Sequence, residues 1–247
     1  MRSQIAAAAL LLAACDGATA PHWFRSSVDD SRLPVALRAA YAEDAARLAL
    51  RDLLRQGFTG IPIPTDASQP YYDALVLVYN APLMPARDTV VDIYRIHTMG
   101  NPATRSLYLV APPDQPWAQR LAHDSLPTGN ATIDRLLSAY ALSYDHAFIF
   151  TDELLIVLRS ADPLNMQALA PQFAQVAGVQ AGPNGVVGEG NDISGSRGDV
   201  IHLDYSVGYG DCPSGCISRR VYHFAIRTDT VEYLGATGSP PPRPGRP

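Results

Sequence analysis

The feature that most constrains the fold is a pair of alternating segments near the C-terminus. Apolar and polar residues alternate over 201–207 and again over 221–226, a pattern typical of half-buried β-strands. Between them lies 208–216, which is rich in glycine and other turn-forming residues. The pattern predicts an antiparallel hairpin with one face in the core. Side chains alternate between the two faces of each strand. The apolar residues of both strands therefore lie on the same face of the hairpin only if the numbers of two directly paired residues add up to an odd value.

Two registers of this hairpin bring histidines and an aspartate together. A sum of 425 pairs His202 with His223 and puts Asp204 beside them, whereas a sum of 427 pairs Asp204 with His223. Two imidazoles and a carboxylate are the groups of a metal site or of a general acid–base cluster. A polar sheet face, open to solvent or covered by a helix, contains the same residue types, and this structural interpretation is favoured. His202, His223 and Asp204 are thus the candidate catalytic or metal-binding residues.

The glycine-rich loop contains Cys212 and Cys216. A fully extended chain would place their Cα atoms about 13–14 Å apart, whereas a disulfide needs about 4.4–6.8 Å. Pro213 and Gly215 permit the tight turn that closes this gap. We expect a disulfide, ahead of a metal site, for which C-x-x-x-C is a weak signal, and of a reactive thiol. So short a loop would contribute about 2 kcal/mol and would stiffen the hairpin tip.

The N-terminus is built like a secretory signal. Arg2 precedes a compact apolar run over 5–14, about ten residues, which is too short for the roughly 20 that span a bilayer. The run ends in Leu-Ala-Ala-Cys over 12–15, which resembles the bacterial lipobox, where the signal is cut before a cysteine that receives acyl chains. The resemblance implies a lipid-anchored, extracytoplasmic protein that begins at Cys15, in a compartment that favours disulfides. The alternative is an ordinary signal peptide cleaved near 18–20.

The cysteine loop carries a second resemblance. The sequence Gly-Tyr-Gly-Asp-Cys-Pro-Ser-Gly-Cys-Ile over 208–217, followed by Tyr-His-Phe over 222–224, is similar to a motif of an uncharacterised group of secreted bacterial proteins. That group usually has Trp where Tyr209 stands. The resemblance extends from the first predicted helix to Leu234, and its specific part is the cysteine loop. It implies an extracytoplasmic domain without an established activity, so it assigns no catalytic residue.

Helices and strands mix along the rest of the chain. The apolar periodicity predicts helices over 34–55, 70–80, 116–123 and 131–141, and strands over 88–97, 106–111, 147–150 and 154–158. A helix over 163–177 lies between two strands, the second beginning at Val179, and this is a strand–helix–strand unit. Because helices and strands do not alternate regularly, the predicted class is α+β, with N-terminal helices packed on a mainly antiparallel sheet.

The composition is that of a globular protein with a packed core. Hydrophobic residues make up 47% of the chain and charged residues 17%, which excludes a disordered protein. We expect a signal peptide over 1–14, a tether over 15–31, a single α+β domain over 32–237 and a disordered, proline-rich tail over 238–247. The length would also suit two small, tightly joined domains.

Missing residue types exclude several enzyme classes. All 19 residues counted as lysine or arginine are arginines, so a P-loop lysine, Schiff-base chemistry and serine–lysine pairs are ruled out. The net charge of −5 argues against nucleic acid as a partner, because phosphate binding needs a surplus of basic residues. No cofactor is predicted, and a divalent metal is the alternative at the histidine cluster.

Two further groups of residues are candidates for ligand binding. Arg47, Arg51 and Arg55 form a stripe on the first helix that could grip an anion, but a solvated face offset by the preceding acidic residues, Glu43 and Asp44, is the favoured interpretation. The other group is a glycine-flanked set with oxygen ligands suited to Ca²⁺. This set lacks the full residue spacing of a calcium-binding loop, so a plain turn is the favoured interpretation. The calcium candidates are Glu189, Asn191 and Asp192.

The leading hypothesis is a lipid-anchored, non-catalytic binding or envelope-associated module outside the cytoplasm. It would contact the membrane through its N-terminal lipid, and its partner would be an envelope protein or a small ligand. The alternative is a metal-assisted or acid–base hydrolase that uses His202, His223 and Asp204. A cleft around the histidines would favour the enzyme, and an exposed apolar patch would favour a binding partner.

Overall fold

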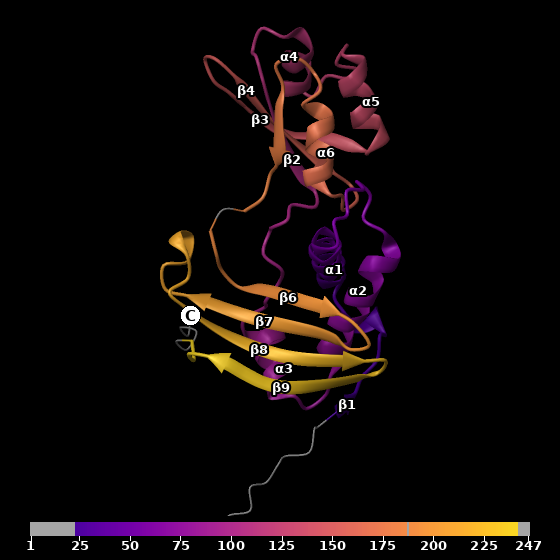
Figure 1. Cartoon of the computed structure of the whole chain (residues 1–247), viewed down its shortest axis with the longest axis vertical. Coiled ribbons are helices and arrows are strands. Elements are labelled where there is room, and N and C mark those ends of the chain that lie inside the picture. The colour runs from indigo at the N-terminus through magenta and orange to yellow at the C-terminus, as the bar shows by residue number, and fades with distance from the viewer. Residues whose placement is uncertain (1–22, 187, 242–247) are drawn as a thin grey trace, which may run out of the picture.

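The computed structural model describes residues 23–186 and 188–241 and shows an α+β protein with two lobes (Figure 1). Each lobe contains one antiparallel sheet with helices against it. The predicted signal peptide and the lipidation site at Cys15 lie outside the described residues. So does the end of the predicted tail, from residue 242.

The lower lobe is a five-stranded antiparallel sheet with two helices on one face (Figure 1). In spatial order its strands are β1 (Trp23–Arg25), β9 (Thr230–Gly238), β8 (Ser218–Arg227), β7 (Ile201–Tyr209) and β6 (Asp192–Arg197). The helices are α1 (Val35–Arg55) and α2 (Thr65–Asn80), and they share one core with the sheet. Leu203, Tyr205 and Phe224 are fully buried in that core. This confirms the predicted packing of N-terminal helices on an antiparallel sheet.

The first helix follows its prediction closely. Helix α1 runs from Val35 to Arg55, within one residue of the predicted range. It ends where Gly57 adopts a positive φ of 81°, while the next amide, of Phe58, donates to the Leu53 carbonyl at 3.0 Å. Glycine is favoured there because it has no Cβ to clash in the left-handed conformation.

Two elements after α1 differ from their predictions. Helix α2 begins at Thr65, five residues before the predicted range of 70–80, and contains Pro70 in its interior. The strand predicted over 88–97 is wrong, because Pro85 opens a helical segment made of α3 (Pro85–Arg87) and the π-helical η2 (Asp88–Ile93). Proline suits a first helical turn, and Val90 alone in η2 is buried. A run of β-branched residues thus packs as a wide helical turn.

The upper lobe is a four-stranded antiparallel sheet. In spatial order its strands are β3 (Leu142–Ile149), β4 (Leu154–Ser160), β2 (Ser106–Ala111) and β5 (Gln180–Pro183). Its helices are α4 (Pro116–Ala122), α5 (Ala131–Ala139) and α6 (Met166–Phe173). The first strand of the lobe, β2, lies between the third and the fourth, which is the split βαβ topology of ferredoxin-like folds. The predicted strand–helix–strand unit is therefore β4–α6–β5, with β2 inserted between its strands.

The buried apolar residues form two clusters, one in each lobe. Composition measures the total apolar content and not its distribution, so it left open whether the chain forms one domain over 32–237 or two small, tightly joined ones. Within the range expected to be a tether, Phe24 of β1 pairs with Val231 of β9. Part of that range therefore belongs to the lower sheet.

Candidate functional site

The C-terminal hairpin adopts the register with a sum of 427, and not 425. Asp204 of β7 lies opposite His223 of β8, and His202 lies opposite Ala225 on the same sheet face. The His223 Nδ1 atom is 2.7 Å from Asp204 Oδ1, and its Nε2 atom is 2.9 Å from Thr237 Oγ1 of β9. Both ring nitrogens of His223 are thus engaged by side chains of its own sheet, and His202 does not lie opposite His223.

The disulfide between Cys212 and Cys216 is present and confirms the predicted pairing. It closes the loop between β7 and β8 around a short turn, η3 (Cys212–Ser214), and Gly215 has a φ of 116°. The Cys212 carbonyl also accepts a hydrogen bond of 2.9 Å from the amide of Glu189. The hairpin tip is thereby attached to the segment that precedes β6.

The calcium candidates bind donors of the protein itself. Glu189 accepts from Arg219 Nη2 at 3.0 Å and Asn191 Oδ1 accepts from the Gly208 amide at 3.2 Å. Asp192 forms an ion pair with Arg51 at 3.1 Å. Within residues 23–186 and 188–241, no three His, Cys, Asp or Glu side chains are grouped so that they could hold a metal ion.

The arginine stripe on α1 is not a solvated face. The side chains of Arg47 and Arg51 are only 11% and 18% exposed. Arg51 donates to the carbonyls of Asn101 and Ile193 at 2.7 and 2.6 Å, and Arg47 Nη1 donates to Thr98 Oγ1 at 2.7 Å. Residues 94–105 form one connection between the two lobes. Arg47 and Arg51 thus attach this connecting segment to α1. Only Arg55, with 59% of its side chain exposed, resembles the predicted solvated arginine.

A buried acid–histidine pair, which the sequence analysis missed, lies next to these arginines. Asp44 of α1 is 2% exposed. Its Oδ1 atom accepts hydrogen bonds from the amide and the hydroxyl of Thr98 at 2.8 and 2.6 Å, and its Oδ2 atom is 2.6 Å from His97 Nδ1. The hydrogen bond to Asp44 raises the pKa of His97 above its ordinary value, although partial burial acts in the opposite direction. The pair fixes the imidazole with its Nε2 atom as the remaining polar position.

His97 lines a cavity of about 520 Å³ beside the N-terminal half of α1. The aromatic rings of Tyr41 and Tyr79 form part of its wall. Tyr41 is 2% exposed, and its ring centroid lies 6.0 Å from that of His97. Desolvation by burial raises the pKa of Tyr41, so it remains a neutral phenol at physiological pH.

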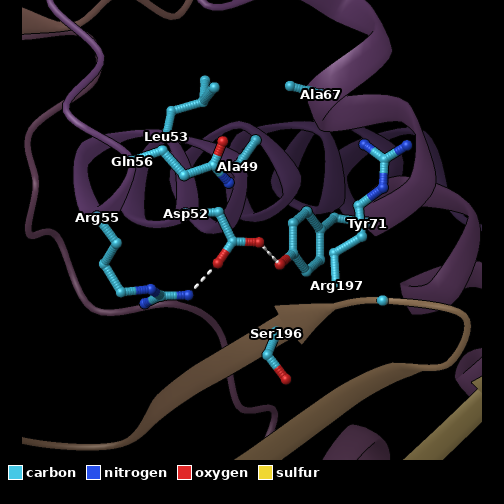
Figure 2. A pocket seen from close by; sticks show the side chains of 10 residues that line it. Ala49, Asp52, Leu53, Arg55, Gln56, Ala67, Tyr71, Ser196 and Arg197 are labelled. Carbon is cyan, nitrogen blue, oxygen red and sulfur yellow. Dashed lines mark hydrogen bonds and ion pairs between the residues drawn. The ribbon is translucent and has the colours of Figure 1, made fainter.

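A second cavity, of about 570 Å³, lies at the other end of α1 between α2 and the β6–β7 turn (Figure 2). Figure 2 shows Asp52 between Arg55 and Tyr71, and each of its oxygens binds one of these side chains. Arg197 on the opposite side donates to the Asp66 carbonyl at 3.2 Å. The ionic groups of this cavity are therefore engaged with the protein itself.

The tip of the β3–β4 hairpin carries exposed apolar residues. Phe148, Ile149 and Phe150 are 52%, 63% and 51% exposed. The rings of Phe148 and Phe150 are stacked with centroids 6.5 Å apart, and His146 meets Phe148 edge-on at 5.2 Å. Sequence periodicity located this strand but gave no sign that its end is exposed.

Comparisons of the chain with protein families, with curated proteins and with solved structures found no match. Among the helices of the described residues, none has the length and apolar character needed to cross a bilayer. The function is therefore inferred from the geometry of these sites.

Proposed function

We propose that the protein is a lipid-anchored, extracytoplasmic, non-catalytic module that binds an envelope protein through the tip of the β3–β4 hairpin. The observation that carries this proposal is the run Phe148–Ile149–Phe150, in which each side chain is more than half exposed. Single exposed apolar residues are ordinary, but adjacent ones, two of them aromatic, are typical of contact sites. The cost of leaving them in water is offset when a partner covers them.

The strand that carries this run also offers a backbone edge. Strand β3 lies at one edge of its sheet and, among the strands of the described residues, pairs with β4 alone. Proteins usually protect such edges with charged residues or bulges. The bulge in β3 lies between Tyr144 and His146, and from His146 to Ile149 the pairing is regular. We therefore infer that the partner supplies an extended segment that pairs with this edge and a groove that receives the apolar side chains.

The position of the tip agrees with attachment to a membrane at the other end. Strand β1 and the β3–β4 hairpin lie at opposite ends of the molecule (Figure 1). The chain from Cys15 to Trp23 spans at most about 29 Å when fully extended. A lipid on Cys15 would keep β1 close to the bilayer, so the hairpin tip would face away from it, toward a partner within the envelope.

Binding to native envelope membranes tests the proposal. Fluorescently labelled full chain with Cys15→Ser, which removes the lipid, is sedimented with membranes of the source organism over a range of concentrations. We expect saturable binding that is lost when the membranes are pretreated with protease. A triple variant, Phe148→Ser, Ile149→Ser and Phe150→Ser, should bind at least tenfold more weakly.

The matched control is Leu83→Ser in the lower lobe, because Leu83 is 93% exposed and its replacement should leave binding unchanged. Circular dichroism of each variant shows that the fold is intact. Equal binding by the triple variant would refute the site. Binding that survives protease would refute a protein partner.

A further inference from the structure

The cavity beside α1 has the size and lining of a small-molecule pocket. It is open to solvent on one side and has a volume of about 520 Å³. Its apolar wall includes Leu37 and Tyr41 of α1, Tyr79 of α2 and Val91 of η2. Pockets for small ligands typically enclose about 300–1,000 Å³ and are mostly apolar, with few polar groups. The cavity lies in the lower lobe, apart from the hairpin tip, so a ligand there would add a second binding activity to the proposed function.

Three lining side chains can carry a charge near neutral pH, namely Asp92, Arg95 and His97, and the first of them is paired. Asp92 of η2 forms an ion pair with Arg87, and Arg87 also donates from Nε to the Tyr79 carbonyl at 2.8 Å. Arg95, which follows η2 with a φ of 47°, is exposed and forms no hydrogen bond or ion pair with any residue of the described ranges. Within the described residues, the charged lining side chain without a partner is therefore a cation, Arg95.

The third group is His97, which is fixed from behind. Its Nδ1 atom is 2.6 Å from the buried carboxylate of Asp44, while 39% of its side chain is exposed. Since Nδ1 is occupied, Nε2 is the ring atom that remains for a ligand. The raised pKa of His97 extends the pH range in which this atom donates a hydrogen bond from a charged ring.

We propose that this cavity binds a small amphiphilic carboxylate. The carboxylate would lie between Arg95 and His97, and the apolar body would lie against Tyr41 and Tyr79. Asp44 is paired with His97, and Arg87 is shared by Asp92 and Asp88. Among the charged side chains that line the cavity, Arg95 is therefore the one left without a partner in the described residues. Its charge attracts an anion and repels a cation of the same size.

Calorimetric titration of the full chain carrying Cys15→Ser tests this inference without detergent. The probes are octanoate, octylammonium and 1-octanol, which share a chain length and differ in the charge of the head group. We expect octanoate to bind with one-to-one stoichiometry and at least tenfold more tightly than octylammonium. Equal affinity for the two ions, or no heat with octanoate, would overturn the proposal.

Two variants locate the site. Arg95→Gln should weaken octanoate binding at least fivefold and leave 1-octanol binding unchanged, while Arg135→Gln, an exposed arginine of the upper lobe, should change neither. Ala40→Trp should fill the cavity, whose wall includes Ala40, and should abolish binding of both ligands while keeping both cations. Full octanoate binding by either Arg95→Gln or a correctly folded Ala40→Trp would contradict the proposed site. These results do not depend on the hairpin tip, so they can fail or succeed independently of the partner proposed above.

Discussion

Replacement of Asp44 should show how strongly the connecting segment is fixed to α1. Asp44 is 2% exposed and accepts three hydrogen bonds, two from Thr98 and one from His97. In Asp44→Ala the Thr98 amide, at a residue only 8% exposed, would lose its acceptor. In Asp44→Asn the side-chain oxygen can still accept from that amide, so this variant removes the charge and keeps most of the geometry.

The expected magnitudes follow from these contacts. An unsatisfied buried donor costs about 1–3 kcal/mol, whereas the side chain of His97 is 39% exposed and can bind water when its partner is removed. We therefore expect Asp44→Ala to lower the free energy of unfolding by about 1–3 kcal/mol, and Asp44→Asn by about 0.5–1.5 kcal/mol. Asp114→Asn, at an exposed position, should stay within about 0.5 kcal/mol of the wild type.

The pair should also make stability depend on pH. The folded-state pKa of His97 is raised above its unfolded value, so its contribution is complete below about pH 6.5. The contribution is then lost as the pH rises through the folded-state pKa. Urea denaturation across this range and NMR titration of His97 measure both effects. Asp44→Asn should lower the His97 pKa and remove this part of the pH dependence. An unchanged His97 titration, or a loss below about 1 kcal/mol in Asp44→Ala, would refute the role assigned to the pair.

Three further predictions concern other parts of the chain. Arg51→Lys should destabilise the fold by about 2 kcal/mol in urea denaturation, because lysine cannot reproduce the forked contacts to Asn101 and Asp192. The control Arg55→Lys, at a side chain 59% exposed, should stay within about 0.5 kcal/mol of the wild type. Equal effects of the two substitutions would contradict the role assigned to Arg51. Alkylation of native protein should label neither Cys212 nor Cys216 before reduction, and their joint replacement by serine should cost at most about 2 kcal/mol; labelling without reductant would show that the bond is absent in solution. Intact mass after bacterial expression should show a chain that begins at Cys15 with added acyl mass, and a mature end near residues 18–20 would show that the lipobox interpretation is wrong.

Elements with strong local periodicity could be predicted from the sequence. Three local patterns each predict a structure to within a few residues. They are the apolar arc of α1, the alternation in β7 and β8, and the short span of the cysteine pair. Strand β6 was not predicted, because its sequence, Asp-Ile-Ser-Gly-Ser-Arg, has a single large apolar residue. It is a strand because it pairs with β7, and that pairing depends on the sheet and not on local propensity.

The candidate sites depend on long-range contacts that periodicity does not report. The sequence does indicate that Asp44 is unusual, because it lies between Tyr41 and Leu48 on the buried arc of α1. A carboxylate at a buried position needs hydrogen-bond donors that are buried with it. Its partner His97 could not be identified, since it belongs to a connecting segment of irregular structure. The exposure of Phe148 follows from the place of β3 at the sheet edge, and strand order cannot be derived from alternation alone.

The most direct test of the proposed function is site-specific photo-crosslinking from the hairpin tip in living cells. A photoreactive amino acid placed at Ile149, which is 63% exposed, should form one dominant crosslink to an envelope protein. The same probe at Leu83, which is 93% exposed in the lower lobe, should not form that crosslink. We expect replacement of Phe148 and Phe150 with serine to abolish the crosslink from Ile149. No crosslink from Ile149, or the same pattern from both positions, would show that the hairpin tip is not the contact site.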